Sequence, residues 1–275
     1  MRLVRLVRFI AAMLRAAWRT SRAAARAPEA ERAGVQARGQ QEGAAACLRA
    51  LGIRVRVDGA LPERAGLLAP NHLGLLDGFV LAATFPCAVA GKSDVAGWPL
   101  IGYVATSMGY VAIHRERKTA TDAFVDAVRA RIADGVSVLV FPEGTTSDGE
   151  GVLPFKTGAF EAVAGSGLPV FPVYHRPLEG RRGLVPTKAF SWVREPLVKS
   201  LWRALGHLPA DYAVVVGAPV STEAATRKTL AVDAFAAVEA MRARTAGTVE
   251  LVALGDGDAD APAVTPGGAR TRAGA

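Results

Sequence analysis

The chain has 275 residues, 51% of them hydrophobic and only 7% aromatic, and a formal net charge of +8. This length allows one large α/β domain with an extension, and the apolar content excludes a disordered chain. The first 27 residues hold seven arginines and no acidic residue, so almost all of the excess charge lies in one segment. That distribution argues against a nucleic-acid groove spread over the domain, and no nucleic-acid partner is expected.

The first 27 residues predict an amphipathic helix, which turns by ~100° per residue. One side collects arginines and the opposite side collects apolar residues. The arginines are Arg5, Arg8, Arg15, Arg19, Arg22 and Arg26, and the apolar residues are Leu3, Leu6, Val7, Ile10, Met13, Leu14 and Trp18. This pattern is typical of a helix lying in the headgroup plane of an anionic membrane, although a helix docked on the protein's own core is the alternative. The charge-free run Phe9–Leu14 is far shorter than the ~20 residues of a spanning helix.

A second helix is expected over 29–51, so residues 1–50 are predicted to form N-terminal membrane-associating helices. Short apolar runs then alternate with helical patterns. Strands are expected over 53–57, 67–69, 110–113, 136–141, 170–174 and 212–216, and helices over 97–107, 119–133, 158–164 and 197–205. Alternation of this kind predicts an α/β domain over 51–250, with a mixed central sheet flanked by helices. Residues 251–275, rich in Gly, Ala, Pro, Asp and Thr, are expected to form a disordered tail.

The segment Asn-His-Leu-Gly-Leu-Leu-Asp, from Asn71 to Asp77, follows a predicted buried strand. On one continuous helix His72 and Asp77 would point about 140° apart, so they meet only if His72 lies on the turn that enters the helix. Asp77 then accepts the Nδ1–H of His72, and Nε2 is left to take a proton from a substrate hydroxyl. Taken alone, the spacing also fits an aspartate helix cap beside a surface histidine.

Further motifs follow in order: Ala-Gly-Lys-Ser-Asp at 90–94, Gly-Tyr-Val-Ala-Ile-His-Arg at 109–115, Phe-Pro-Glu-Gly-Thr at 141–145 and Leu-Pro-Val-Phe-Pro-Val at 168–173. Together with the His-Asp segment they closely resemble the glycerolipid acyltransferase family, which includes the 1-acylglycerol-3-phosphate acyltransferases. The resemblance covers about residues 51–219. It implies a glycerol-3-phosphate acyltransferase-like fold, with acyl-CoA or acyl carrier protein bearing the acyl group as co-substrate and no further cofactor.

The resemblance also implies roles for single residues. His72 and Asp77 correspond to the catalytic dyad, and the acceptor headgroup is expected to lie near Lys92, Arg115, Glu143, Gly144 and Thr145. A guanidinium can bind a phosphate with two hydrogen bonds, and an ammonium offers it a point charge. Without the family, Arg115 also fits a solvated loop, Lys92 an ordinary surface lysine and Glu143 a carboxylate at the end of a strand. His114, His175 and His207 lie outside the motifs and are expected to be structural or surface residues.

One position departs from the family. Members that accept phosphate usually have an arginine directly after Glu-Gly-Thr, and this chain has Thr146 there. The segments 145–149 and 153–156 are similar to relatives that acylate lyso-ornithine lipid. We therefore expect transfer of a fatty acyl group to 1-acyl-sn-glycerol-3-phosphate in phospholipid biosynthesis, with lyso-ornithine lipid as the alternative acceptor.

Two other classes of function fit parts of the sequence. A membrane-bound scaffold without turnover would tolerate Thr146, but it gives no reason to keep His72 and Asp77. A metal-dependent hydrolase would need clustered ligands, and neither the histidines nor Cys47 and Cys87 have metal-ligand spacing, so no metal site is expected. The two cysteines suit a reducing compartment. We expect a peripheral or monotopic protein on the cytoplasmic face of the inner membrane.

Overall fold

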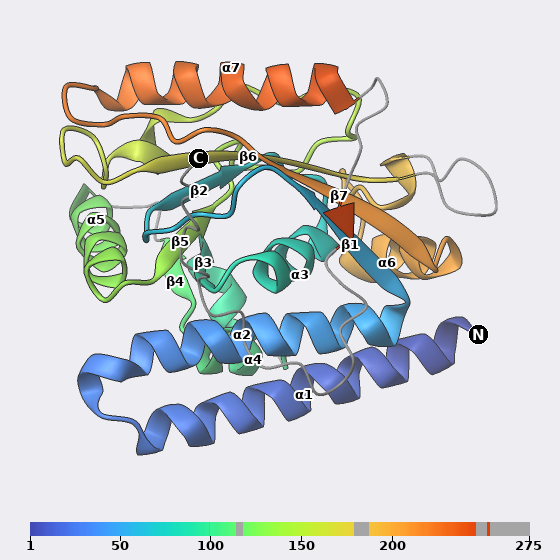
Figure 1. The fold of residues 1–275 in the computed structure, drawn as a ribbon. Coiled ribbons are helices and arrows are strands. Elements are labelled where there is room, and N and C mark those ends of the chain that lie inside the picture. The colour runs from blue at the N-terminus through green and yellow to red at the C-terminus, as the bar shows by residue number, and fades with distance from the viewer. Residues whose placement is uncertain (99, 114–117, 179–186, 246–251, 254–275) are drawn as a thin grey trace, which may run out of the picture.

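The computed structural model describes residues 1–98, 100–113, 118–178, 187–245 and 252–253. Within this part of the chain a mixed sheet separates two sets of helices, as the sequence predicts (Figure 1). The strands are β1 (Ile53–Asp58), β2 (Leu67–Pro70), β3 (Cys87–Lys92), β4 (Val111–Ile113), β5 (Ser137–Val140), β6 (Val170–Pro177), β7 (Ala210–Val216) and β8 (Val252–Ala253).

The order of strands across the sheet is β4-β3-β5-β2-β6-β7-β1-β8. Strands β4, β3, β5, β2 and β6 run parallel to one another, whereas β7 pairs antiparallel with β6 and parallel with β1. The carboxyl ends of β3, β5 and β2 therefore meet at one edge of the sheet, and this edge holds the predicted motifs.

Helices cover both faces of the sheet. On one face lie α5 (Lys118–Ala133) and α7 (Arg227–Thr245), and on the other lies α3 (Leu75–Thr84), which α2 (Glu29–Leu51) and then α1 (Arg2–Arg26) cover in turn (Figure 1). The remaining helices are α4 (Ile101–Ser107), α6 (Leu197–Gly206) and the 3₁₀ helices η1 (Ser93–Gly97), η2 (Thr157–Phe160) and η3 (Thr187–Ala189). Each face has its own apolar core, and buried side chains such as Leu68 and Val128 fill the two.

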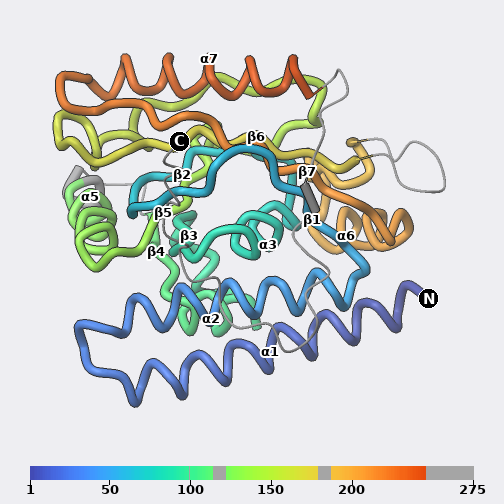
Figure 2. Tube along the Cα trace, in the orientation of Figure 1, coloured from blue at the N-terminus to red at the C-terminus, as the bar shows by residue number. Residues whose placement is uncertain are grey.

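Helices α1 and α2 form a long antiparallel hairpin below α3 (Figure 2). Small residues let the two helices approach closely. A Cβ atom at Gly39 would lie 2.2 Å from Oγ1 of Thr20, and one at Gly43 would lie 2.6 Å from the Cβ of Ala16. The two glycines are four residues apart on α2, and Thr20 and Ala16 are four residues apart on α1. Residues with this spacing lie on the same side of a helix, so the two helices pack through small residues along one side of each.

The structure divides the apolar side that the sequence predicts for α1. Met13 is buried and Leu6 is partly buried, because this part of the helix packs toward α2 and the core. Leu3, Val7 and Trp18 remain 63%, 58% and 55% exposed. One part of the apolar side therefore packs on the protein's own core, which was the alternative, and the other part faces outward. No helix in the described ranges is both long enough and apolar enough to cross a membrane.

The remaining differences from the predicted elements are local. Strand β3 was not predicted, because its run of alanine and glycine has low β-propensity. The helix expected over 158–164 is only the short 3₁₀ helix η2, in a segment where glycines disfavour an α-helix. The predicted tail at 251–275 lies outside the described residues except for β8. Division of the chain at residues 50 and 250 stays a prediction.

Candidate active site

His72 lies on the turn between β2 and α3, as the spacing of the motif predicts. Helix α3 begins at Leu75, so Asp77 is in its first turn and its side chain can reach back to the turn. The Nδ1 atom of His72 lies 2.8 Å from Oδ2 of Asp77. The carboxylate fixes the proton on Nδ1, which leaves Nε2 as the basic nitrogen.

Asp77 is almost completely buried, with 1% of its surface exposed. Its Oδ2 atom also accepts the main-chain N–H groups of Leu73 at 2.5 Å and Gly74 at 2.8 Å. Burial by itself raises the pKa of Asp77, but the electrostatic interactions with His175 and His72 and the hydrogen bonds from His72 and Gly74 outweigh burial and bring that pKa below its ordinary value. Asp77 is therefore held as a carboxylate behind His72.

The main chain of His72 is fixed at both ends by the segment that follows β5. Its N–H donates to Oε1 of Glu143 at 2.7 Å, and its carbonyl accepts the N–H of Ser147 at 2.9 Å. The other oxygen of Glu143 accepts the N–H of Leu153 at 3.1 Å. The imidazole ring stacks on Phe141 with 3.8 Å between ring centroids. Both the main chain and the ring of His72 are thus held by residues 141–147, and 22% of its side chain stays exposed.

Glu143 was predicted to lie at the headgroup site. The structure places its carboxyl group inside the protein, where it is 1% exposed and bonds to main-chain donors. Burial raises the pKa of Glu143 to about 8, although the bonds from His72 and Leu153 lower it. This geometry suits a residue that holds the His72 turn better than one that touches a substrate.

The other predicted headgroup residues lie along the same edge of the sheet. Lys92 ends β3 and is exposed, and Thr145 is exposed directly after Gly144. The carbonyl of Lys92 accepts the hydroxyl of Tyr110 at 3.0 Å. Direct contact with the dyad is made by Glu143 and not by Lys92. Arg115 lies outside the described residues.

The surroundings of position 146 add Lys156, which the sequence marked only as part of the segment 153–156 and not as a headgroup residue. The hydroxyl of Thr146 donates to the carbonyl of Trp192, so it ties two loops together. Lys156 instead lies over the turn: its N–H bonds to the carbonyl of Pro142 at 2.8 Å, and its Nζ atom would be 2.8 Å from a Cβ at Gly144. Gly144 has φ of +67° and no side chain, which leaves room for this exposed lysine.

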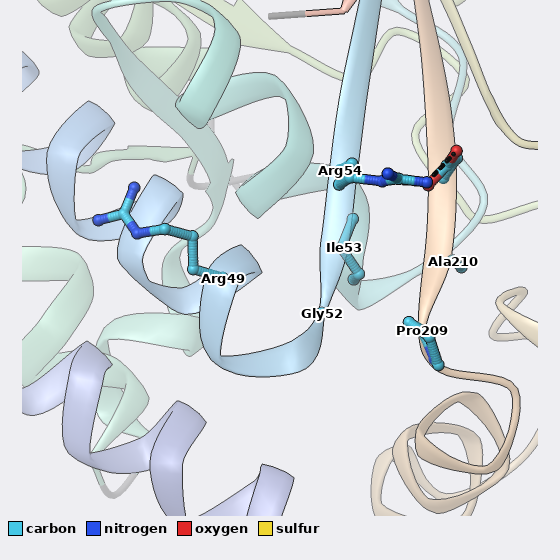
Figure 3. A pocket seen from close by; sticks show the side chains of 7 residues that line it. Arg49, Gly52, Ile53, Arg54, Pro209 and Ala210 are labelled. Atoms are coloured by element: carbon cyan, nitrogen blue, oxygen red, sulfur yellow. Dashed lines mark hydrogen bonds and ion pairs between the residues drawn. The ribbon is translucent and has the colours of Figure 1, made fainter. Parts of the chain in front are cut away.

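The structure has a separate open hollow of about 410 Å³ between the end of α2 and the first residues of β1 and β7. Arg54 reaches across it to the carboxylate of Asp211 at 2.9 Å, whereas Arg49 points away from that pair (Figure 3). No predicted site residue lines this hollow. In the part of the chain that the structure describes, no three His, Cys, Asp or Glu residues gather in a way that could hold a metal ion.

Comparison with known proteins gives three results. The acyltransferase family profile matches residues 52–176. The lyso-ornithine lipid O-acyltransferase of Rhizobium meliloti is 39% identical in an alignment of 167 residues that covers 51% of this chain and 56% of that protein. The 1-acyl-sn-glycerol-3-phosphate acyltransferase of Neisseria gonorrhoeae is 32% identical over 160 residues, or 57% of this chain and 61% of that protein. The chain thus matches little more than half the length of these relatives.

A solved structure has the same fold. The 1-acyl-sn-glycerophosphate acyltransferase of Thermotoga maritima superimposes with a TM-score of 0.63, over 91% of this chain and 100% of that one, at 17% sequence identity. At this identity the likeness concerns the fold alone.

Proposed function

We propose that this chain, whose residues 52–176 match the acyltransferase family profile, transfers a fatty acyl group from an acyl thioester to the hydroxyl of a lysolipid. One observation carries this proposal. The Nδ1 atom of His72 is bonded to a buried carboxylate, Asp77, on a turn that leaves the ring partly exposed. This is the arrangement of a general base that works on a substrate alcohol.

The proposed reaction needs no protein nucleophile. Nε2 of His72 takes the proton of the acceptor hydroxyl as its oxygen attacks the thioester carbonyl. The tetrahedral intermediate then expels the thiolate, which takes the proton back from Nε2, and the products are an ester and a free thiol. Asp77 stabilises the imidazolium that forms between the two steps. General-base help of this kind is worth about 10²–10⁴ in rate.

We further propose that the acceptor carries an acidic group, recognised at the carboxyl ends of β3, β4 and β5. Lys92, Arg115, Gly144 and Thr145 are the headgroup residues that the family resemblance indicates, and the position of Lys156 over Gly144 adds an ammonium to them. An ammonium group binds a phosphate or a carboxylate as a point charge. Glu143 contributes by fixing the turn.

Two acceptors fit an acidic headgroup. The sequence alone placed 1-acyl-sn-glycerol-3-phosphate first. Two observations now favour lyso-ornithine lipid, whose headgroup has a carboxylate in place of a phosphate. The chain has no arginine at position 146, and the threonine there is hydrogen-bonded to the loop that contains Trp192. A relative named for this acceptor is 39% identical. The acyl donor is acyl-CoA or acyl carrier protein, and no further cofactor is proposed.

Helix α1 is proposed to hold the protein on the cytoplasmic face of an anionic membrane. Exposed apolar residues, Leu3, Val7 and Trp18, run along it, and a stripe of exposed arginines lies beside them. The guanidinium of Arg22 stacks over the Trp18 ring at 5.1 Å. An apolar stripe beside a basic stripe suits the boundary between acyl chains and headgroups.

The function is tested with purified protein in detergent, each acyl thioester, and lysophosphatidate or lyso-ornithine lipid in parallel. Release of free thiol with one acceptor, lost in His72→Ala and kept in His207→Ala, supports the transferase; His207 is exposed at the end of α6. The acceptor that is used identifies the substrate. Absence of release with every combination would favour a membrane-bound scaffold without turnover.

Membrane binding is tested by sedimentation with vesicles. Wild-type protein should bind vesicles that contain anionic lipid more strongly than zwitterionic ones, and Val7→Ser should weaken binding. Val232→Ser is the matched control, because Val232 is 65% exposed on α7, on the opposite face of the sheet. Equal effects of the two substitutions would contradict the proposed orientation.

A further inference from the structure

His175 lies directly behind the His72–Asp77 pair, although its sequence position suggests only a structural role. It is on β6 and completely buried, at 0% exposure. Its Nε2 atom lies 3.0 Å from the main-chain carbonyl of Asn71 and 3.8 Å from Oδ2 of Asp77. The ring thus touches both the residue before His72 and the carboxylate that orients it.

Asn71 and His175 are joined by two more hydrogen bonds. The N–H of His175 donates to Oδ1 of Asn71 at 2.8 Å, and the Asn71 amide donates to the carbonyl of His175 at 3.0 Å. These bonds involve only the main chain of His175. They tie β6 to the turn whatever side chain stands at 175, so a substitution there should leave the turn attached to the sheet.

The ring makes a separate electrostatic contribution. With its Nε2–H donated to Asn71, His175 is neutral and directs the positive end of its dipole toward Asp77. Burial lowers the pKa of His175, although the charge of Asp77 and the bond to Asn71 act in the opposite direction. A neutral ring is consistent with a dry interior, where a second imidazolium beside His72 would oppose proton uptake.

The surroundings give Asp77 few other donors. Its Oδ1 atom, the Nδ1 atom of His175 and the hydroxyl of Tyr212 are buried, and in the described part of the chain none has a hydrogen-bond partner. The ionisable groups coupled to Asp77 are His72 on the turn, Glu143 after β5, His175 on β6 and Tyr212 on β7. Of these, His72 and His175 each hold a ring nitrogen near Oδ2, at 2.8 and 3.8 Å, and His175 is the one that comes from a strand and not from the turn.

We propose that His175 is a positioning residue that keeps the Asn71 carbonyl and the Asp77 carboxylate in place, and thereby sets the proton affinity of His72. The inference rests on the proposed function for its catalytic meaning. The effect of a buried N–H group on the His72–Asp77 pair is present in the resting protein, so it can be measured without turnover.

The test follows the titration of the His72 ring by NMR in wild-type protein, His175→Leu and His175→Gln. Leucine removes the N–H of residue 175. We then expect the pH midpoint of the titration observed at the His72 ring to rise by at least ~0.5 pH unit, because the Asp77 carboxylate loses a favourable neighbour. Glutamine can place an amide N–H where Nε2–H stood, so its midpoint should return toward that of wild type. Tyr212→Phe removes a buried hydroxyl from the adjacent strand and should leave the midpoint unchanged.

Thiol release gives the second readout. His175→Leu should lower kcat on the order of tenfold with little change in KM, and the acid limb of the kcat/KM profile should move to higher pH. A folded His175→Leu protein whose His72 midpoint equals that of wild type would overturn the inference, and so would equal shifts in the leucine and glutamine variants. An inactive wild-type protein would overturn the proposed function and leave the NMR result to decide the role of His175.

Discussion

Lys156 shows at the scale of one residue how the site compensates for Thr146. The lysine lies over Gly144, beside the turn that holds His72, and the hydroxyl at 146 is bonded to Trp192. A positive charge therefore stays close to the Glu-Gly-Thr turn, although position 146 is a threonine and not an arginine. Under the proposed function, Lys156 supplies this charge in place of a guanidinium at position 146.

We predict that Lys156→Met raises KM for the acidic acceptor about tenfold and changes kcat little, because it removes a headgroup charge and leaves the dyad intact. Lys156→Arg should keep most of the affinity. Lys228→Met is the matched control, on the first turn of α7 and away from this turn. Steady-state kinetics with the active acceptor check this, and an unchanged KM in Lys156→Met would remove Lys156 from the headgroup site.

Glu143 gives a prediction on stability and pH. Its pKa in the folded protein is about 8, above the ordinary value of 4.5. Between these values the unfolded chain has lost the proton while the folded protein keeps it. Stability should therefore fall as pH rises, by as much as ~1.4 kcal/mol per pH unit.

The window from pH 6.5 to 8 isolates Glu143, because the lowered pKa values of Asp77 and His175 act at lower pH. In urea titrations across this window, Glu143→Gln should flatten the decline in free energy of unfolding. Glu63→Gln, an exposed carboxyl on the loop before β2, should keep the wild-type slope. If the free energy of unfolding changed with pH equally in wild type, Glu143→Gln and Glu63→Gln, Glu143 would be ionised in the folded protein at neutral pH.

At the scale of elements, the dyad could be predicted because it is local: five residues on a strand-turn-helix corner leave one way for His72 and Asp77 to meet. Lys156 and His175 could not be placed in this way. Their positions depend on long connections that return β6 beside β2 and fold residues 153–156 over the end of β5. No periodicity in the sequence reports such a return.

The α1–α2 hairpin yields a prediction about packing. Alanine favours a helix over glycine by about 1 kcal/mol, so Gly34→Ala, whose Cβ would meet only the flexible end of Arg38 at 3.3 Å, should stabilise the protein slightly. Gly39→Ala should destabilise it by roughly 2 kcal/mol or more, because its Cβ would lie 2.2 Å from Thr20 and force the helices apart. Thermal unfolding checks this, because the unfolding temperature should rise in Gly34→Ala and fall in Gly39→Ala. A stabilised Gly39→Ala would mean that the two helices are less close than described.

At the scale of the whole molecule, the alternation of strands and helices predicted the α/β class and the mixed sheet, but not which face of α1 is covered. The helical pattern separates arginines from apolar residues, and it cannot tell an apolar residue that packs on α2 from one that faces outward. Met13 and Val7 belong to the same predicted side, yet one is buried and the other is 58% exposed. The packing of α1 against α2, α4 and α6 decides between them.

The folded molecule also determines how its two cysteines behave. Cys47 lies under α1, and Cys87 begins β3 in the core below α3. Burial raises the pKa of each thiol to about 12, although Arg49 slightly opposes this at Cys47. Because the thiolate is the reactive form, both should be inert toward a disulfide reagent at pH 8 in the native protein and should react fully once it is unfolded.

A colorimetric thiol titration with and without denaturant measures this directly. Unreactive cysteines would also give the thiol-release assay a low background, so that colour reports product and not enzyme. If one thiol reacted within seconds in the native state, the part of the structure that buries it would be opening. Repeating the titration on Cys47→Ala and Cys87→Ala would then assign that motion to α1–α2 or to the sheet.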